Sequence, residues 1–109
     1  MITVTALLEN GTPVGFTVTG HAGQGAYGED LVCAAVSAIV QTAILGVTEV
    51  LKLNAGVSVE EGNSSCILER GTGEADAARA AIVFETMLTG LKSVQAAYPR
   101  TLKFRNKEV

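Results

Sequence analysis

The sequence predicts a two-layer α+β domain in the order ββαββαβ, with a mainly antiparallel sheet and two helices on one face. Three observations predict this class. Two pairs of short segments alternate apolar and polar residues around turn residues, two longer segments have apolar helical patterns, and one short alternating segment follows the second helix. With 48% apolar residues in 109, the chain has enough material for one core. We therefore expect residues 1–109 to form a single domain.

The first two strands are predicted to form a hairpin. Residues 2–8 alternate apolar positions with Thr and Leu, which is the pattern of a strand with one buried face. Asn10-Gly11 follows, and this dipeptide suits the positive-φ positions of a type I′ turn. Residues 14–18 alternate again, and the hairpin is expected to end at Gly20.

The first helix is expected to begin at a cap on Asp30 and to run to about Leu53. Residues 31–48 carry no charge, and their length is at the lower limit for a membrane span. Ser, Gln, Thr and Gly residues and many alanines interrupt this stretch. They favour instead a helix buried by its own sheet and by a partner subunit.

The second half repeats the pattern of hairpin and helix. Residues 57–60 and 66–69 alternate around an expected turn at Gly62-Asn63. A second helix then carries one apolar stripe, and Pro99 ends it. A last short strand is expected at residues 101–105. The stripe consists of Ala80, Phe84, Met87, Leu91, Val94 and Tyr98.

Composition excludes several classes of function. The first twenty residues contain no Lys or Arg and are interrupted by turn residues, so we expect no signal peptide. Two cysteines without an export signal indicate free thiols in a reducing compartment, so a cytoplasmic location is expected. The net charge is -3, and the basic residues concentrate near the C-terminus. This argues against direct binding to nucleic acid, and we expect no membrane association.

The residues that carry chemistry lie in one stretch, from Gly20 to Ser37. His21 is the only histidine, and Cys33 is one of two cysteines, expected as the third residue of the first helix. The first turn of a helix favours a thiolate, and a neighbouring imidazole can accept the thiol proton. The loop between them contains Gly23, Gly25 and Gly28, whose backbone amides could approach a substrate carbonyl.

Other residues have weaker claims to a role in this site. Asp30 is a candidate to orient His21 as well as a cap, although a carboxylate near the thiol opposes thiolate formation. Ser37 lies one turn after Cys33 on the same helical face, as a polar neighbour of the site or a small core residue. Cys66 shares the apolar face of a strand with Leu68 and is expected to be a core residue.

Simpler readings and other site types compete with a catalytic pair. A cysteine near a helix start is often only a small buried hydrophobe, and a histidine in a glycine-rich loop is often a surface residue. Residues 23–28 also fit G-x-G-x-x-G, but the preceding strand alternates like a hairpin strand, and two carboxylates follow where a pyrophosphate would need positive potential. One histidine and two distant cysteines supply no recognisable zinc ligand set. We expect no cofactor and no metal.

The same stretch resembles the signature of a known family. Gly20-His21-Ala22, the spaced glycines Gly25 and Gly28, and the segment DLVCAAVS at 30–37 are similar to the ribosomal-processing cysteine protease family Prp. The resemblance covers essentially the whole chain, because the length, the element order and the glycine-rich segment before the second helix are also similar.

The resemblance implies a specific function. Family members are cytosolic, dimeric cysteine endopeptidases that remove an N-terminal extension from large-subunit ribosomal protein twenty-seven, cutting after an aromatic-rich motif. On that pattern Cys33 is the nucleophile and His21 is the general base, and the loop residues Gly20, Ala22, Gly23, Gly25 and Gly28 contact the substrate. The resemblance supplies no clear third member. Two alternatives remain: a non-catalytic ribosome-assembly adaptor that binds a peptide at the sheet edge, and a redox sensor that pairs Cys33 with Cys66.

Overall fold

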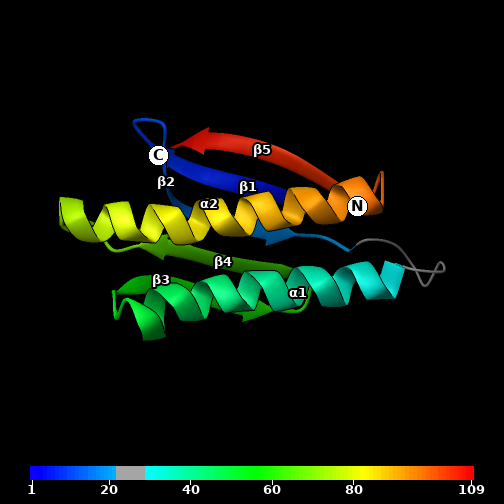
Figure 1. The fold of residues 1–109 in the computed structure, drawn as a ribbon, viewed down its shortest axis with the longest axis horizontal. Helices are drawn as coiled ribbons and strands as arrows, with labels where there is room; N and C mark the ends of the chain where they lie inside the picture. Colours follow the sequence, from blue (N-terminus) through cyan, green and yellow to red (C-terminus); the bar gives the residue numbers. More distant parts are fainter. Residues whose placement is uncertain (22–28) are drawn as a thin grey trace.

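The computed structural model of the protein describes the backbone of residues 1–21 and 29–109. Side chains are described for residues 1–21 and 31–109. The predicted α+β class and the order ββαββαβ are confirmed (Figure 1). A short π-helical segment, η1, extends the first helix. The elements are β1 Ile2–Glu9, β2 Thr12–Thr19, α1 Glu29–Leu45, η1 Gly46–Val50, β3 Ala55–Glu60, β4 Asn63–Leu68, α2 Glu74–Ala97 and β5 Leu102–Glu108.

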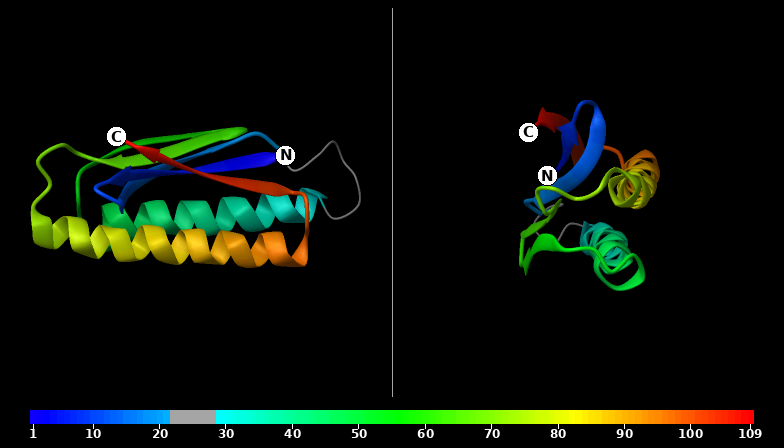
Figure 2. Two further views of the ribbon diagram at one scale, coloured as in Figure 1. Left: turned by 90° about the horizontal axis from the view of Figure 1, so that it is seen from above. Right: turned by 90° about the vertical axis from the view of Figure 1, so that its left-hand side faces the viewer.

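The described strands form a five-stranded sheet in the order β3-β4-β2-β1-β5. Neighbouring strands are antiparallel except β1 and β5, which are parallel, with Ile2 opposite Leu102. Figure 2 shows α1 and α2 side by side on one face of this sheet. The chain therefore brings its first and last strands together on one side and its second hairpin to the other.

The first hairpin follows the predicted turn chemistry. Asn10 has φ 51° and Gly11 has φ 79°, so both turn residues adopt the positive φ that this dipeptide tolerates. A bulge interrupts the pairing, because Leu7 pairs with Gly15 whereas Leu8 pairs with Pro13. The bulge places the extra residue outside the ladder and keeps the apolar side chains that follow it, Phe16 and Val18, on the buried face.

The first helix differs from the prediction at both ends. It begins at Glu29, so Asp30 is a helical residue and not the cap that we expected. At the other end, the amide of Leu51 donates to the carbonyl of Gly46 over 2.9 Å, a bond five residues back that widens the last turn. Lys52 then adopts φ 55° and ends the helical path before the expected Leu53.

The apolar length of the first helix meets the requirement for a membrane span. Leu31–Val50 has a mean hydropathy of 2.1, and 33% of its most apolar window is buried. Its inward side chains Val32, Val36 and Val40 are buried within the core cluster. Such packing against the sheet is typical of a core helix that is apolar also on its outer side.

The core lies between the sheet and the two helices. Phe16 of β2 and Phe84 of α2 are fully buried, and their rings meet edge to face at a centroid distance of 5.9 Å. The apolar stripe of α2 is confirmed from Ala80 to Leu91, but Tyr98 lies beyond the helix and is 37% exposed. Aromatic contacts of this geometry add about 1 kcal/mol to the burial of the rings themselves.

Candidate active site

His21 follows directly on the end of β2, where the second hairpin determines the path of the backbone. Thr19 pairs with Asn63, so the turn between β3 and β4 lies next to the end of β2. The amide of Gly20 donates to the carbonyl of Gly62 over 2.9 Å. Gly20 has φ +93°, and a side chain there would begin 2.5 Å from the carbonyl oxygen of Met1, so only glycine suits this position.

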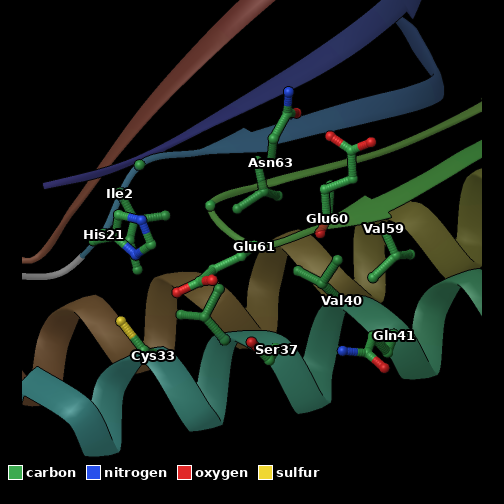
Figure 3. A pocket seen from close by; sticks show the side chains of 15 residues that line it. Ile2, His21, Cys33, Ser37, Val40, Gln41, Val59, Glu60, Glu61 and Asn63 are labelled. Carbon is green, nitrogen blue, oxygen red and sulfur yellow. The ribbon is translucent and has the colours of Figure 1, made fainter.

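Cys33 lies on α1, facing the same region. Val32 and Val36 are buried beneath the sheet, and this orientation of the helix turns the half-buried Cys33 toward the second hairpin. In Figure 3 its sulfur points from α1 toward His21. Because α1 begins at Glu29, Cys33 is the fifth helical residue and not the third as expected. The helix terminus therefore supports a thiolate less than we predicted, since this effect falls off beyond the first turn.

A pocket of about 480 Å³ joins the two side chains. One wall is α1, where Cys33, Ser37 and Gln41 follow one another at spacings of four residues along one helical face. The other described lining residues come from β1, from β2 with the two residues after it, from α1 and from the second hairpin. They are Ile2, Val18, Gly20, His21, Val36, Val40, Val59, Glu60, Glu61, Gly62, Asn63 and Ser64.

The structure brings together Gly20, His21, Cys33 and Ser37 among the predicted site residues. No hydrogen bond joins His21 to Cys33, both of which belong to the described part of the chain. The predicted substrate-loop residues Ala22, Gly23, Gly25 and Gly28 lie outside the described residues, as does the side chain of Asp30. Their roles stay predictions.

The second hairpin contributes residues to the pocket that sequence reasoning missed. Glu60 and Glu61 are exposed, and among the described lining residues they supply the Asp and Glu carboxylates. Figure 3 shows the carboxylate of Glu61 directed into the space between His21, Cys33 and Ser37. The sequence contained a signal, the turn residues at Gly62-Asn63, but not the pairing that places this turn beside His21.

The other thiol differs from Cys33 in its burial and in its position relative to the pocket. Cys66 on β4 is fully buried, as predicted, and does not line the pocket. Burial raises the pKa of the Cys66 thiol from 9.0 to about 11. A buried neutral thiol is a poor nucleophile, so the pocket holds the one cysteine suited to chemistry.

The described residues contain no recognisable set of metal ligands. Among the side chains of residues 1–21 and 31–109, no three from His, Cys, Asp or Glu are placed to hold one ion. The site instead presents a thiol and an imidazole to one pocket. Such a pair can exchange a proton, and the sulfur can then form a thioester with an acyl group of a substrate.

The fold and the pocket define a class: a small α+β protein that presents a helix-borne thiol and an imidazole to a shared pocket, the pair that cysteine hydrolases use. The chain belongs to a particular family of this class, cysteine protease Prp, whose sequence profile matches residues 1–103. The resemblance predicted from the central stretch is thereby confirmed. No curated protein matches the sequence significantly.

Solved structures share the fold over nearly the whole chain. The protein SMU.848 from Streptococcus mutans is 24% identical, covers 100% of this chain and 96% of its own, and has a TM-score of 0.82. The essential ribosomal processing protease Prp from S. aureus, in complex with a covalently linked product peptide, is 23% identical with a TM-score of 0.81. In complex with a substrate peptide, it is 22% identical with a TM-score of 0.82. Both S. aureus structures cover 98% of this chain and 100% of their own.

Proposed function

We propose that this cysteine protease removes the N-terminal extension of large-subunit ribosomal protein twenty-seven, with Cys33 as nucleophile and His21 as general base, in a domain that spans residues 1–109. The observation that carries the proposal is the shared pocket, into which the sulfur of Cys33 and the imidazole of His21 project from different elements.

Acylation begins with a proton transfer between the two side chains. The imidazole of His21 accepts the proton of the Cys33 thiol, and the thiolate sulfur attacks the carbonyl carbon of the scissile peptide bond. The carbonyl oxygen becomes an oxyanion. When this intermediate collapses, the carbon–nitrogen bond breaks and the imidazolium gives its proton to the leaving amine. The released fragment is the mature ribosomal protein, and the extension stays bound to Cys33 as a thioester.

Deacylation uses the same two residues. The neutral imidazole accepts a proton from a water molecule, and the resulting hydroxide attacks the thioester carbonyl. The carbon–sulfur bond breaks, the extension leaves as a carboxylic acid, and the imidazolium returns its proton to the sulfur of Cys33, which restores the thiol and the neutral imidazole. Ser37, one turn along α1 from Cys33, offers a hydroxyl to the substrate backbone from the same wall of the pocket.

The charge of the pocket supports a ribosomal substrate. Glu60 and Glu61 give the described lining two carboxylates and no Lys or Arg. Proteins that bind the phosphates of ribosomal RNA carry many basic side chains, and a substrate with such residues near the cleavage site would be attracted to this pocket. The S. aureus relative has been solved with a substrate peptide, which supports the same kind of ligand for this pocket.

The test is cleavage of an N-terminally extended ribosomal protein twenty-seven, followed by mass spectrometry. Wild type should cut at one site, Cys33→Ala and His21→Ala should bind the extension without cutting it, and Cys66→Ala should still cut. Loss of rate in the first two variants should reach at least a thousandfold. A wild-type protein that binds the extension but never cuts it would establish the adaptor alternative and refute the protease.

We further propose that the protein is a homodimer through the outer face of its two helices. An apolar groove of about 560 Å³ runs between α1 and α2 on this face. Ile82 beside it is 65% exposed and Leu45 is 56% exposed, more than a helix facing only water needs. A second copy covering this face would bury these side chains, as the high apolar content of α1 predicted.

Sedimentation velocity at micromolar concentration tests the dimer. Ile82→Lys should yield a monomer, because it places a charge within the apolar contact. The matched control is Ile67→Lys, at a position 39% exposed on β4, where the side chain points to the opposite face of the sheet from the buried Cys66 and Leu68. Ile67→Lys should leave the dimer intact. If wild type sediments as a monomer, the dimer proposal fails and the protease proposal stands.

We propose a cytoplasmic location as well. Both Cys33 and Cys66 are free, as is usual in a reducing compartment. Cell fractionation would test the location, and recovery of the protein with secreted or membrane material would contradict it.

A further inference from the structure

The imidazole ring of His21 lies against the backbone of Gly62, in the turn of the second hairpin. A β-carbon added at Gly62 would lie 2.7 Å from Nε2 of His21 and 3.1 Å from Cε1. Ordinary contact begins at 3.4 Å, so the imidazole would have to move by about 0.7 Å to make room. The ring of His21 therefore packs directly on the backbone of Gly62.

The backbone on either side of this contact is also joined. The amide of Gly20, the residue before His21, donates to the carbonyl of Gly62 over 2.9 Å. Thr19 pairs with Asn63, the residue after Gly62. One turn thus holds the chain that leads into His21 by a hydrogen bond and limits the position of the ring by direct contact.

We propose that Gly62 is the positioning residue of His21, so that the turn between β3 and β4 determines where the general base stands relative to Cys33. This inference rests on the proposed role of His21. A base that acts on a thiol and then on a leaving amine must keep its nitrogen within hydrogen-bond reach of both, and a displacement of about 1 Å can reduce the rate about a hundredfold. A glycine at position 62 permits the required approach, and any side chain displaces the ring.

The chain offers a matched control for the substitution. Gly62 has φ +73°, so Gly62→Ala combines backbone strain with a clash against the ring. Gly71 has φ +83° in another turn and has nothing within 4 Å of an added β-carbon. Gly71→Ala therefore imposes the same kind of strain without touching His21, and the difference between the two variants isolates the contact.

Activity and structure can be measured separately because His21 is the only histidine. In untagged protein its imidazole has a single set of NMR signals. Gly62→Ala should shift these signals and lower kcat by about tenfold to a hundredfold. Gly71→Ala should leave both unchanged, and both variants should lose similar stability to urea. Gly62→Asn, whose side chain tolerates positive φ, should reproduce the loss of kcat with less loss of stability.

The positioning role of Gly62 and the catalytic role of His21 can fail separately. If wild type cleaves and His21→Ala does not, but Gly62→Ala and Gly62→Asn match Gly71→Ala in kcat and in imidazole signals, the positioning role is refuted and the protease stands. If His21→Ala cleaves normally, the role of His21 fails first. If the variants at Gly62 do not fold, the contact is tested in the wild-type protein. We expect nuclear Overhauser effects between the ring protons of His21 and the α-protons of Gly62. Their absence would overturn the inference.

Discussion

Alkaline pH should destabilise this protein through one buried thiol. Burial raises the pKa of Cys66 from 9.0 to about 11 in the folded state. The folded protein therefore keeps a proton that the unfolded chain releases. The stability that Cys66 contributes is fully present below pH 9 and is lost as the pH rises through about 11.

The size of the effect follows from the two pKa values. At pH 10 the unfolded thiol is mostly ionised, whereas the folded thiol is about one tenth ionised. The difference in proton binding between the folded and unfolded states gives a loss of about 1 kcal/mol in the free energy of unfolding between pH 8 and pH 10. For a domain that is stable by about 5–15 kcal/mol, this is a measurable fraction.

Urea denaturation followed by circular dichroism, at several pH values under reducing conditions, measures this loss. Cys66→Ala is the comparison, because it lacks the thiol but keeps every other group that titrates in this range. It will be less stable at all pH values, since it leaves a small cavity, so the slopes with pH are compared and not the absolute values. The wild type should lose about 1 kcal/mol more than the variant between pH 8 and pH 10. Equal slopes for the two proteins would contradict a raised pKa of Cys66 in the folded state.

Three further substitutions test the packing that holds the site. A β-carbon at Gly15 would lie 2.8 Å from Cα of Ile67, so Gly15→Ala should cost about 1–3 kcal/mol in urea denaturation, whereas Gly56→Ala, which meets the same residue from the other side at 3.5 Å, should be nearly neutral. A loss of the same size in both variants would contradict this. Phe84→Ala removes the ring that meets Phe16 and should cost about 3–5 kcal/mol by the same assay. A loss below about 1 kcal/mol would show that the core rearranges around the cavity.

The local parts of the fold could be predicted from the sequence because neighbouring residues determine them. The turn at Asn10-Gly11 has the φ values that its residues favour, and the stripe of α2 follows helical spacing. The helix α1 begins at Glu29, before the cap expected at Asp30. An acidic residue is favoured both as a cap and in the first turn, so the sequence does not distinguish the two positions. The end of the same helix depends on a widened turn at Gly46, which no periodicity indicates.

The site could be predicted only in part. His21 and Cys33 are rare residue types in a distinctive stretch, and their shared pocket is what the pattern indicated. Glu61 and Gly62 also line the pocket, and the local turn signal at Gly62-Asn63 did not indicate that position. Their place depends on the pairing of β2 with β4, whose register joins Thr19 to Asn63 across 43 intervening residues. The register is set by burial of Phe16 opposite Cys66, a property of the assembled sheet and not of either strand.

The parallel pairing of the first and last strands makes one wall of the pocket depend on the end of the chain. Ile2 lines the pocket, and its amide donates to the carbonyl of Thr101, next to the strand that completes the sheet beside β1. A ribosome that is still making the chain holds a polypeptide with Cys33 and His21 already translated but without β5. The pocket wall at Ile2 then lacks its support until residues 102–108 emerge.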